Sequence, residues 1–221
     1  MPSLPLWSQL INLLAALLLL LAFAMLTQRR VLSLIRLFAA QGFVLALSTL
    51  VVAYTTNQPD LYVSVAVTFG LKVLALPWFL HWLIRKLNVQ WDIETVINIP
   101  VQMLVGIVLV IFAFNLAAPI SEIAGTITKS TLGIAIASIL LSFLMMIARR
   151  KAVSQVIGFL AMENGLFFAA TSATYGMPLV VELGILFDVL VGTLVFGVFF
   201  FQIRETFESL DIHHLEKLKD R

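Results

Sequence analysis

This 221-residue chain lacks cysteine and has few charged residues. It contains no cysteine, which excludes disulfides, cysteine-ligated iron–sulfur clusters and thiolate zinc sites. Only 12% of the residues are charged, whereas 61% are hydrophobic and the mean hydropathy is +1.05. A soluble domain usually carries about 25% charged residues, and a 24.5 kDa protein has too little interior to bury so much apolar surface. The composition therefore excludes a soluble enzyme and a nucleic-acid-binding module, and it indicates a protein embedded in lipid.

Long apolar runs occupy most of the chain. A bilayer-crossing helix needs roughly 20 mainly apolar residues, and seven stretches satisfy this requirement: residues 7–26, 31–54, 61–84, 96–117, 127–148, 152–174 and 178–203. These runs are far longer than the strands of a membrane barrel, which alternate over about 10 residues. We therefore predict an all-α polytopic integral membrane protein with seven transmembrane helices, whose one sizeable aqueous segment is the tail 204–221.

The basic residues predict the orientation of these helices. One side of the membrane would hold twelve of them: Arg29, Arg30, Arg36, Arg85, Lys86, Arg149, Arg150, Lys151, Arg204, Lys217, Lys219 and Arg221. The other side would hold Lys129 alone. The positive-inside rule then predicts an extracytoplasmic N-terminus and a cytoplasmic C-terminus in the cell inner membrane. No base precedes the first span, so we expect it to be an uncleaved helix rather than a signal peptide.

The chain also shows the outline of an internal repeat. Arg29 and Arg30 precede the second span much as Arg149 and Arg150 precede the sixth. This pattern divides a single transmembrane domain into a three-helix unit (1–86), a linker with the fourth span (87–126), a second three-helix unit (127–203) and the cytoplasmic tail (204–221). We expect two parallel repeats joined by the linker helix.

Three ionisable residues fall near the middle of a predicted span: Lys72, Glu163 and Asp188. A charge at the bilayer centre costs about 2.5–3.5 kcal/mol on insertion scales, so such residues usually face the protein interior and mark ion or proton pathways. A carboxyl group there can take up and release a proton. The structural alternatives are a permanently protonated Glu163 that hydrogen-bonds a neighbouring helix, and a fixed Lys72–Asp188 pair that serves assembly.

Several other residues are weaker candidates for a functional role. Ser64 and Thr68 precede Lys72 at helical spacing, which predicts one polar face, and Pro77 predicts a kink. Glu182 near the outer boundary and His81 near the cytoplasmic boundary are secondary candidates for the proton pathway. Other features carry no chemistry of their own. Gln41 has the depth of Glu163 in the other repeat but cannot titrate, and the tail histidines lack further ligands at metal spacing, so we expect no metal and no cofactor.

Several segments resemble the hydrogenase-4 component E family. Residues 155–165 read Gln-Val-Ile-Gly-Phe-Leu-Ala-Met-Glu-Asn-Gly, residues 181–188 read Val-Glu-Leu-Gly-Ile-Leu-Phe-Asp, and residues 72–77 read Lys-Val-Leu-Ala-Leu-Pro. The tail segment 210–219 is also similar to that family. The last three spans are similar to subunit K of respiratory complex I, which carries two intramembrane acids. These acids correspond to Glu163 and Asp188 in this chain.

The resemblance implies a membrane subunit of a complex-I-like nickel–iron hydrogenase or formate hydrogenlyase assembly. Partner subunits would perform the redox chemistry, so this chain is not expected to be an enzyme by itself. It would provide acids for proton or ion translocation beside antiporter-like membrane subunits, within lipid and without nucleic acid. Two alternatives remain open, an independent small secondary transporter and a non-conducting membrane scaffold of the same complex.

Overall fold

The computed structural model describes residues 6–86, 95–124 and 129–174, with residues 192 and 197. Side chains at 86, 121–124, 129–130 and 172–174 are outside this description, as are Glu182, Asp188, the rest of the seventh predicted span and the tail. Within the described ranges, the structure is all-α and has no strand beyond one isolated bridge between Thr95 and Arg149.

In the part of the chain that the structure describes, six helical runs are long and apolar enough to cross a membrane. They are α1 (Leu6–Thr27), α2 (Val31–Thr56), a continuous run of α3 (Pro59–Thr68), η1 (Phe69–Ala75) and α4 (Leu76–Lys86), then α5 (Ile99–Ala124), α6 (Lys129–Ala148) and α7 (Ala152–Thr174). These runs confirm the first six predicted spans, with boundaries that agree within three residues except at the end of α5, which extends seven residues beyond the predicted end. The seventh, 178–203, stays a prediction.

A tight turn joins α2 to α3. Asn57 ends α2 with a left-handed backbone (φ 54°), a conformation that asparagine tolerates better than most residues. Pro59 then opens α3, where its missing N–H has no helical partner to lose, and Asp60 follows in the first turn. Because this connection is so short, α3 folds back antiparallel along α2.

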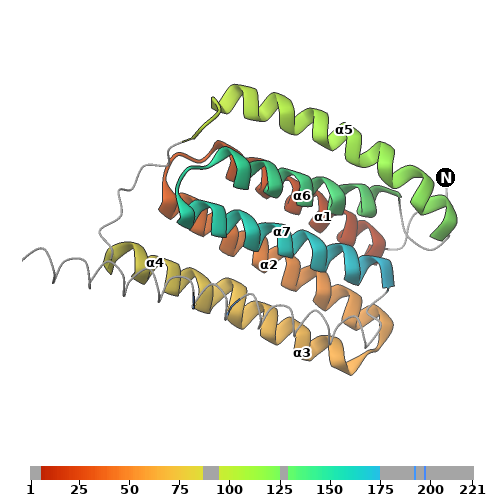
Figure 1. The fold of residues 1–221 in the computed structure, drawn as a ribbon. Helices are drawn as coiled ribbons and strands as arrows, with labels where there is room; N and C mark the ends of the chain where they lie inside the picture. The colour runs from red at the N-terminus through yellow and green to blue at the C-terminus, as the bar shows by residue number, and fades with distance from the viewer. Residues whose placement is uncertain (1–5, 87–94, 125–128, 175–191, 193–196, 198–221) are drawn as a thin grey trace, which may run out of the picture.

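The helices form four layers (Figure 1). α5 lies on the outside against α6 and α1, which pack together. The α2–α7 pair forms the next layer, and the run α3–η1–α4 covers α2 on the far side. Only 17% of the α5 span is buried, against 61% of the α7 span. The centre of the molecule is therefore the layer of α2 and α7, between the α1–α6 layer and the α3–η1–α4 run.

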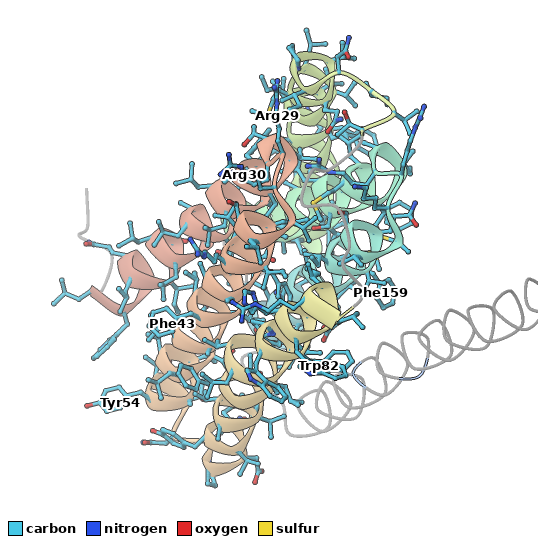
Figure 2. All side chains as sticks on the ribbon, turned by 90° about the vertical axis from the view of Figure 1, so that its left-hand side faces the viewer. Arg29, Arg30, Phe43, Tyr54, Trp82 and Phe159 are labelled. Carbon is cyan, nitrogen blue, oxygen red and sulfur yellow. The ribbon has the colours of Figure 1, made fainter. Side chains whose placement is uncertain are left out.

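The basic residues gather at one end of this bundle. The α1–α2 and α6–α7 connections and the end of α4 lie on the left in Figure 1, and Figure 2 looks onto this end, where Arg29 and Arg30 are labelled. Arg85, Arg149 and Arg150 belong to the same end. We call it the basic end. The α2–α3 turn lies at the opposite end, which the charge count predicts to face away from the cytoplasm.

Two glycines allow helices to approach closely. A Cβ atom on Gly42 of α2 would lie 3.0 Å from the Cβ of Lys72, and one on Gly165 of α7 would lie 2.9 Å from Ile139 Cγ1 and 3.2 Å from the Ile139 backbone nitrogen. Both positions border the ionisable residues described below. The absence of a side chain there lets α2 contact η1, and α7 contact α6, at backbone distance.

Substitution of Gly165 tests the second of these contacts. We expect Gly165→Ala to destabilise the protein by about 1–3 kcal/mol, because overpacking forces α6 and α7 apart. Gly70→Ala is the matched control, since nothing lies within 4 Å of a Cβ at Gly70. Thermal unfolding in detergent compares the two variants. Equal unfolding temperatures would contradict the close contact.

Candidate functional site

An ion pair lies buried between η1 and α7. Lys72 Nζ is 2.7 Å from Glu163 Oε1, and the two side chains are 1% and 2% exposed. The residues are 91 positions apart in the chain, so the pair exists only because the fold brings the two helical runs together. Each charge alone would be costly in hydrocarbon. Their direct hydrogen bond offsets part of that cost.

The π-helical segment η1 turns Lys72 toward this partner. In an α-helix, four residues cover about 400°, so each i, i+4 step drifts by about 40°. From Thr68 to Lys72 the chain follows η1, whose wider turn reduces that drift. At the end of η1, the Leu76 N–H donates to the Leu71 carbonyl five residues earlier. Lys72 therefore stays on the buried face. The irregularity that the sequence predicts at Pro77 takes the form of this segment, which ends two residues before Pro77.

Aromatic and glycine residues complete the surroundings of Lys72. The Phe167 ring centroid is 5.4 Å from Lys72 Nζ, within the range of a cation–π contact. Gly42 lies against the Lys72 backbone. Phe167 lies four residues after Glu163 on α7, and its ring faces the cation of the pair.

A second polar contact lies one residue from Glu163. Asn164 Nδ2 donates to Gln41 Oε1 at 3.2 Å, and both side chains are fully buried. This contact joins α7 to α2. Gln41 thus lies close to the depth that the repeat alignment predicts, and its amide belongs to the same polar cluster as the ion pair.

The predicted polar face of the third span is confirmed. Ser64, Thr68 and Lys72 are all buried, at 0%, 1% and 1% exposure. The helices that carry Ser64 and Lys72 both pack on α2. The described ion-pair cluster therefore consists of Lys72, Glu163, Gln41 and Asn164, with Ser64 and Thr68 continuing it toward the opposite end.

Other predicted site residues are not brought to this cluster. His81 is half-buried on α4, nine residues from Lys72 and so about 13 Å along the helix axis. Asp188 and Glu182 fall outside the described residues. Among the described residues, Lys72 forms an ion pair with Glu163. The alternative of a fixed Lys72–Asp188 pair stays a prediction, because Asp188 lies outside these residues.

The sequence does not single out Asn164 and Arg149, which are both buried in the structure. Asn164 follows Glu163 in the chain and enters the sequence analysis only as part of a motif. Arg149 is 1% exposed and donates through Nη2 to the Met25 and Leu26 carbonyls at 3.0 and 2.9 Å. Burial lowers the pKa of the Arg149 guanidinium from its ordinary value to about 10. Nothing in the sequence distinguishes Arg149 from the exposed Arg150 beside it.

The comparisons with known proteins agree with a multi-pass membrane protein. The chain is 31% identical over 189 residues to Uncharacterized protein Rv0085 of Mycobacterium tuberculosis, covering 85% of this chain and 86% of that protein. The chain belongs to the family of this mycobacterial protein. It is also distantly homologous to Hydrogenase-4 component E of Escherichia coli, at 25% identity over 184 residues and 82% of this chain and 84% of that protein. Hydrogenase-4 component E of Shigella flexneri matches equally. No protein-family model and no solved structure matches the chain.

Proposed function

We propose that this chain is a membrane subunit of a complex-I-like nickel–iron hydrogenase assembly, in which the Lys72–Glu163 pair takes part in proton translocation. The observation that carries the proposal is the 2.7 Å contact between two ionisable groups buried within membrane-spanning helices. Homology to a hydrogenase component over most of the chain supplies the kind of complex. Formate hydrogenlyase is one such assembly.

The geometry supports proton transfer within the pair. At 2.7 Å the ammonium and the carboxylate are within hydrogen-bond reach, so a proton passes from Nζ to Oε1 without an intervening group. That transfer leaves two neutral groups in place of two charges. A change of charge in a neighbouring subunit shifts the balance between these two states, because electrostatic interactions are strong in a low-dielectric interior. Redox chemistry in partner subunits is thereby coupled to the protonation of Glu163.

Three further features complete the proposal. The last three spans take the place of subunit K of respiratory complex I, with Asp188 as the second acid of the path. The two three-helix units are parallel repeats, a relation supported by the packing of α1 on α6 and of α2 on α7. The basic end faces the cytoplasm, and antiporter-like membrane subunits are the partners.

Glu163→Gln tests the role in translocation. The amide still accepts a hydrogen bond from Lys72 but cannot carry a proton. In membrane vesicles that contain the whole complex, we expect hydrogen turnover to continue. The rate of vesicle acidification should fall at least about tenfold, because the substitution removes a group that carries a proton. A fluorescent pH indicator and hydrogen measurement record the two quantities separately.

The control for this experiment is Asp60→Asn, which removes an exposed carboxyl at the start of α3. It should leave both quantities unchanged, and Glu163→Asp should restore part of the acidification. If Glu163→Gln changes neither quantity, the chain is a non-conducting scaffold of the complex. If the purified chain alone moves a substrate, it is an independent transporter.

A further inference from the structure

The surroundings of the ion pair differ between the two ends of the bundle. From Lys72 to Lys86 the helical run extends about 21 Å toward the basic end. Its buried side chains over that length are Leu76, Leu80, Leu83 and Ile84, each at most 3% exposed. They belong to one apolar cluster with Leu34 and Phe38 of α2 and with Ile157 and Leu160 of α7. This cluster separates the ion pair from the basic end.

Toward the opposite end, the buried face is polar. Thr68 and Ser64 are four and eight residues from Lys72 on this face, and Ser64 is about 8 Å from the start of α3. A smaller apolar cluster of Val52, Ala53 and Leu61 borders this last turn. The apolar barrier on this side is therefore about one helical turn deep, against several turns at the basic end.

The hydroxyl groups of Ser64 and Thr68 differ from those of Thr49, Ser142 and Thr171, although Ser138 and Ser154 likewise have no hydrogen-bond partner among the described residues. Thr49, Ser142 and Thr171 each donate to a carbonyl one turn earlier in their own helix, which is the usual arrangement in a membrane helix. Ser64 Oγ and Thr68 Oγ1 are fully buried and have no hydrogen-bond partner among the described residues. A buried hydroxyl without a protein partner is usually satisfied by water.

The amides beside the pair have the same property. Gln41 Nε2 and Asn164 Oδ1 are buried, and neither has a hydrogen-bond partner within the described part of the chain. Four polar atoms without a hydrogen-bond partner among the described residues thus lie at the depth of the ion pair or between it and the opposite end. Several polar partners are what a buried water needs in order to be held.

We propose that the ion pair exchanges protons through a hydrated half-path that runs past Thr68 and Ser64 to the end of the bundle opposite the basic end. The ligand of this path is a short file of water molecules. The apolar cluster at Leu80 and Phe38 closes the path toward the basic end. With the orientation predicted from the bases, protons reach or leave Glu163 from the extracytoplasmic side. This inference rests on the proposed function for its purpose, but its hydration can be measured independently.

The absence of cysteine allows a direct test. Ser64→Cys and Thr68→Cys each introduce one thiol into the chain, and Leu76→Cys and Leu80→Cys are matched positions on the basic-end side. Right-side-out and inside-out vesicles containing the whole complex are treated with a membrane-impermeant methanethiosulfonate. The thiols that remain are then counted with a maleimide on the isolated chain.

Only a thiol in contact with water ionises and reacts readily, so the Ser64→Cys and Thr68→Cys variants should react at least about tenfold faster from the extracytoplasmic side. Leu76→Cys and Leu80→Cys should stay unmodified from the cytoplasmic side. Absence of reaction at both Ser64→Cys and Thr68→Cys, or faster reaction from the cytoplasmic side, overturns the half-path.

A functional measurement separates this inference from the proposed function. Thr68→Val should slow vesicle acidification several-fold, whereas Thr49→Val, which removes a hydroxyl already bonded to the Leu45 carbonyl, should not. If Glu163→Gln abolishes acidification but Thr68→Val has no effect and the thiols are unreactive, the half-path is wrong and the proposed function stands. If the thiols react but Glu163→Gln changes nothing, the path is hydrated and the proposed function is wrong.

Discussion

Lys72→Met is expected to destabilise the protein by about 3–5 kcal/mol, the usual cost of removing one partner from a buried ion pair. Methionine fills nearly the same volume as the lysine side chain, so packing beside Gly42 is kept. What is lost is the cation 2.7 Å from Glu163 Oε1. Glu163 is then left in an apolar interior, either charged without its partner or protonated. The measurement is thermal unfolding of the purified protein in detergent.

Two further variants make this result specific. Arg85→Met removes an exposed base from the same helical run and should change stability by less than about 0.5 kcal/mol. The double variant Lys72→Met with Glu163→Leu replaces both charges by apolar side chains, and it should recover most of the lost stability. If Lys72→Met is as stable as Arg85→Met, the pair contributes nothing to the fold.

The sequence predicts the helices well because hydrophobic length alone decides whether a segment spans a membrane. It also predicts that Lys72 and Glu163 face the protein interior, because a charged side chain that faces lipid is costly. It does not predict that they contact each other. Helical periodicity assigns a residue to a face, whereas the neighbour of that face depends on how helices 91 residues apart pack. The sequence therefore leaves the partner of Lys72 open.

The course of the third span shows the same limit. Pro77 predicts a disturbed helix because it removes one backbone donor. The structure adapts through η1 on the N-terminal side of the proline, and this adjustment keeps Lys72 in line with Ser64 and Thr68. Proline marks the place of an irregularity in a sequence. The form that the irregularity takes follows from which side chain must be buried.

Burial distinguishes basic residues that stabilise the fold from those that contribute only to membrane orientation. Arg149 and Arg150 are neighbours in one loop and count equally in the positive-inside rule. Arg150 is exposed, whereas Arg149 reaches into the α1–α6 contact and satisfies carbonyls in the last turn of α1. The Ala24 carbonyl in the same turn accepts from Thr27 Oγ1 and Gln28 Nε2. Side chains thus replace the hydrogen bonds that every helix end lacks.

Arg149→Met should therefore cost at least about 2 kcal/mol of stability, because the Leu26 carbonyl loses its donor and the Met25 carbonyl loses its strongest one. The loss of stability is smaller than the summed free energies of the two hydrogen bonds. Burial lowers the pKa of Arg149 to about 10, so the protonated guanidinium itself costs free energy in the folded state, and the substitution removes that cost.

Arg150→Met is the matched control for this prediction. It removes the same charge from the same loop, so any change in membrane orientation caused by the loss of one base would affect both variants equally. Thermal unfolding in detergent should show a lower unfolding temperature for Arg149→Met alone, and amide hydrogen exchange should show faster exchange in the last turn of α1. Equal unfolding temperatures and equal exchange would mean that Arg149 acts only through its charge, as Arg150 does, and that α1 ends without its help.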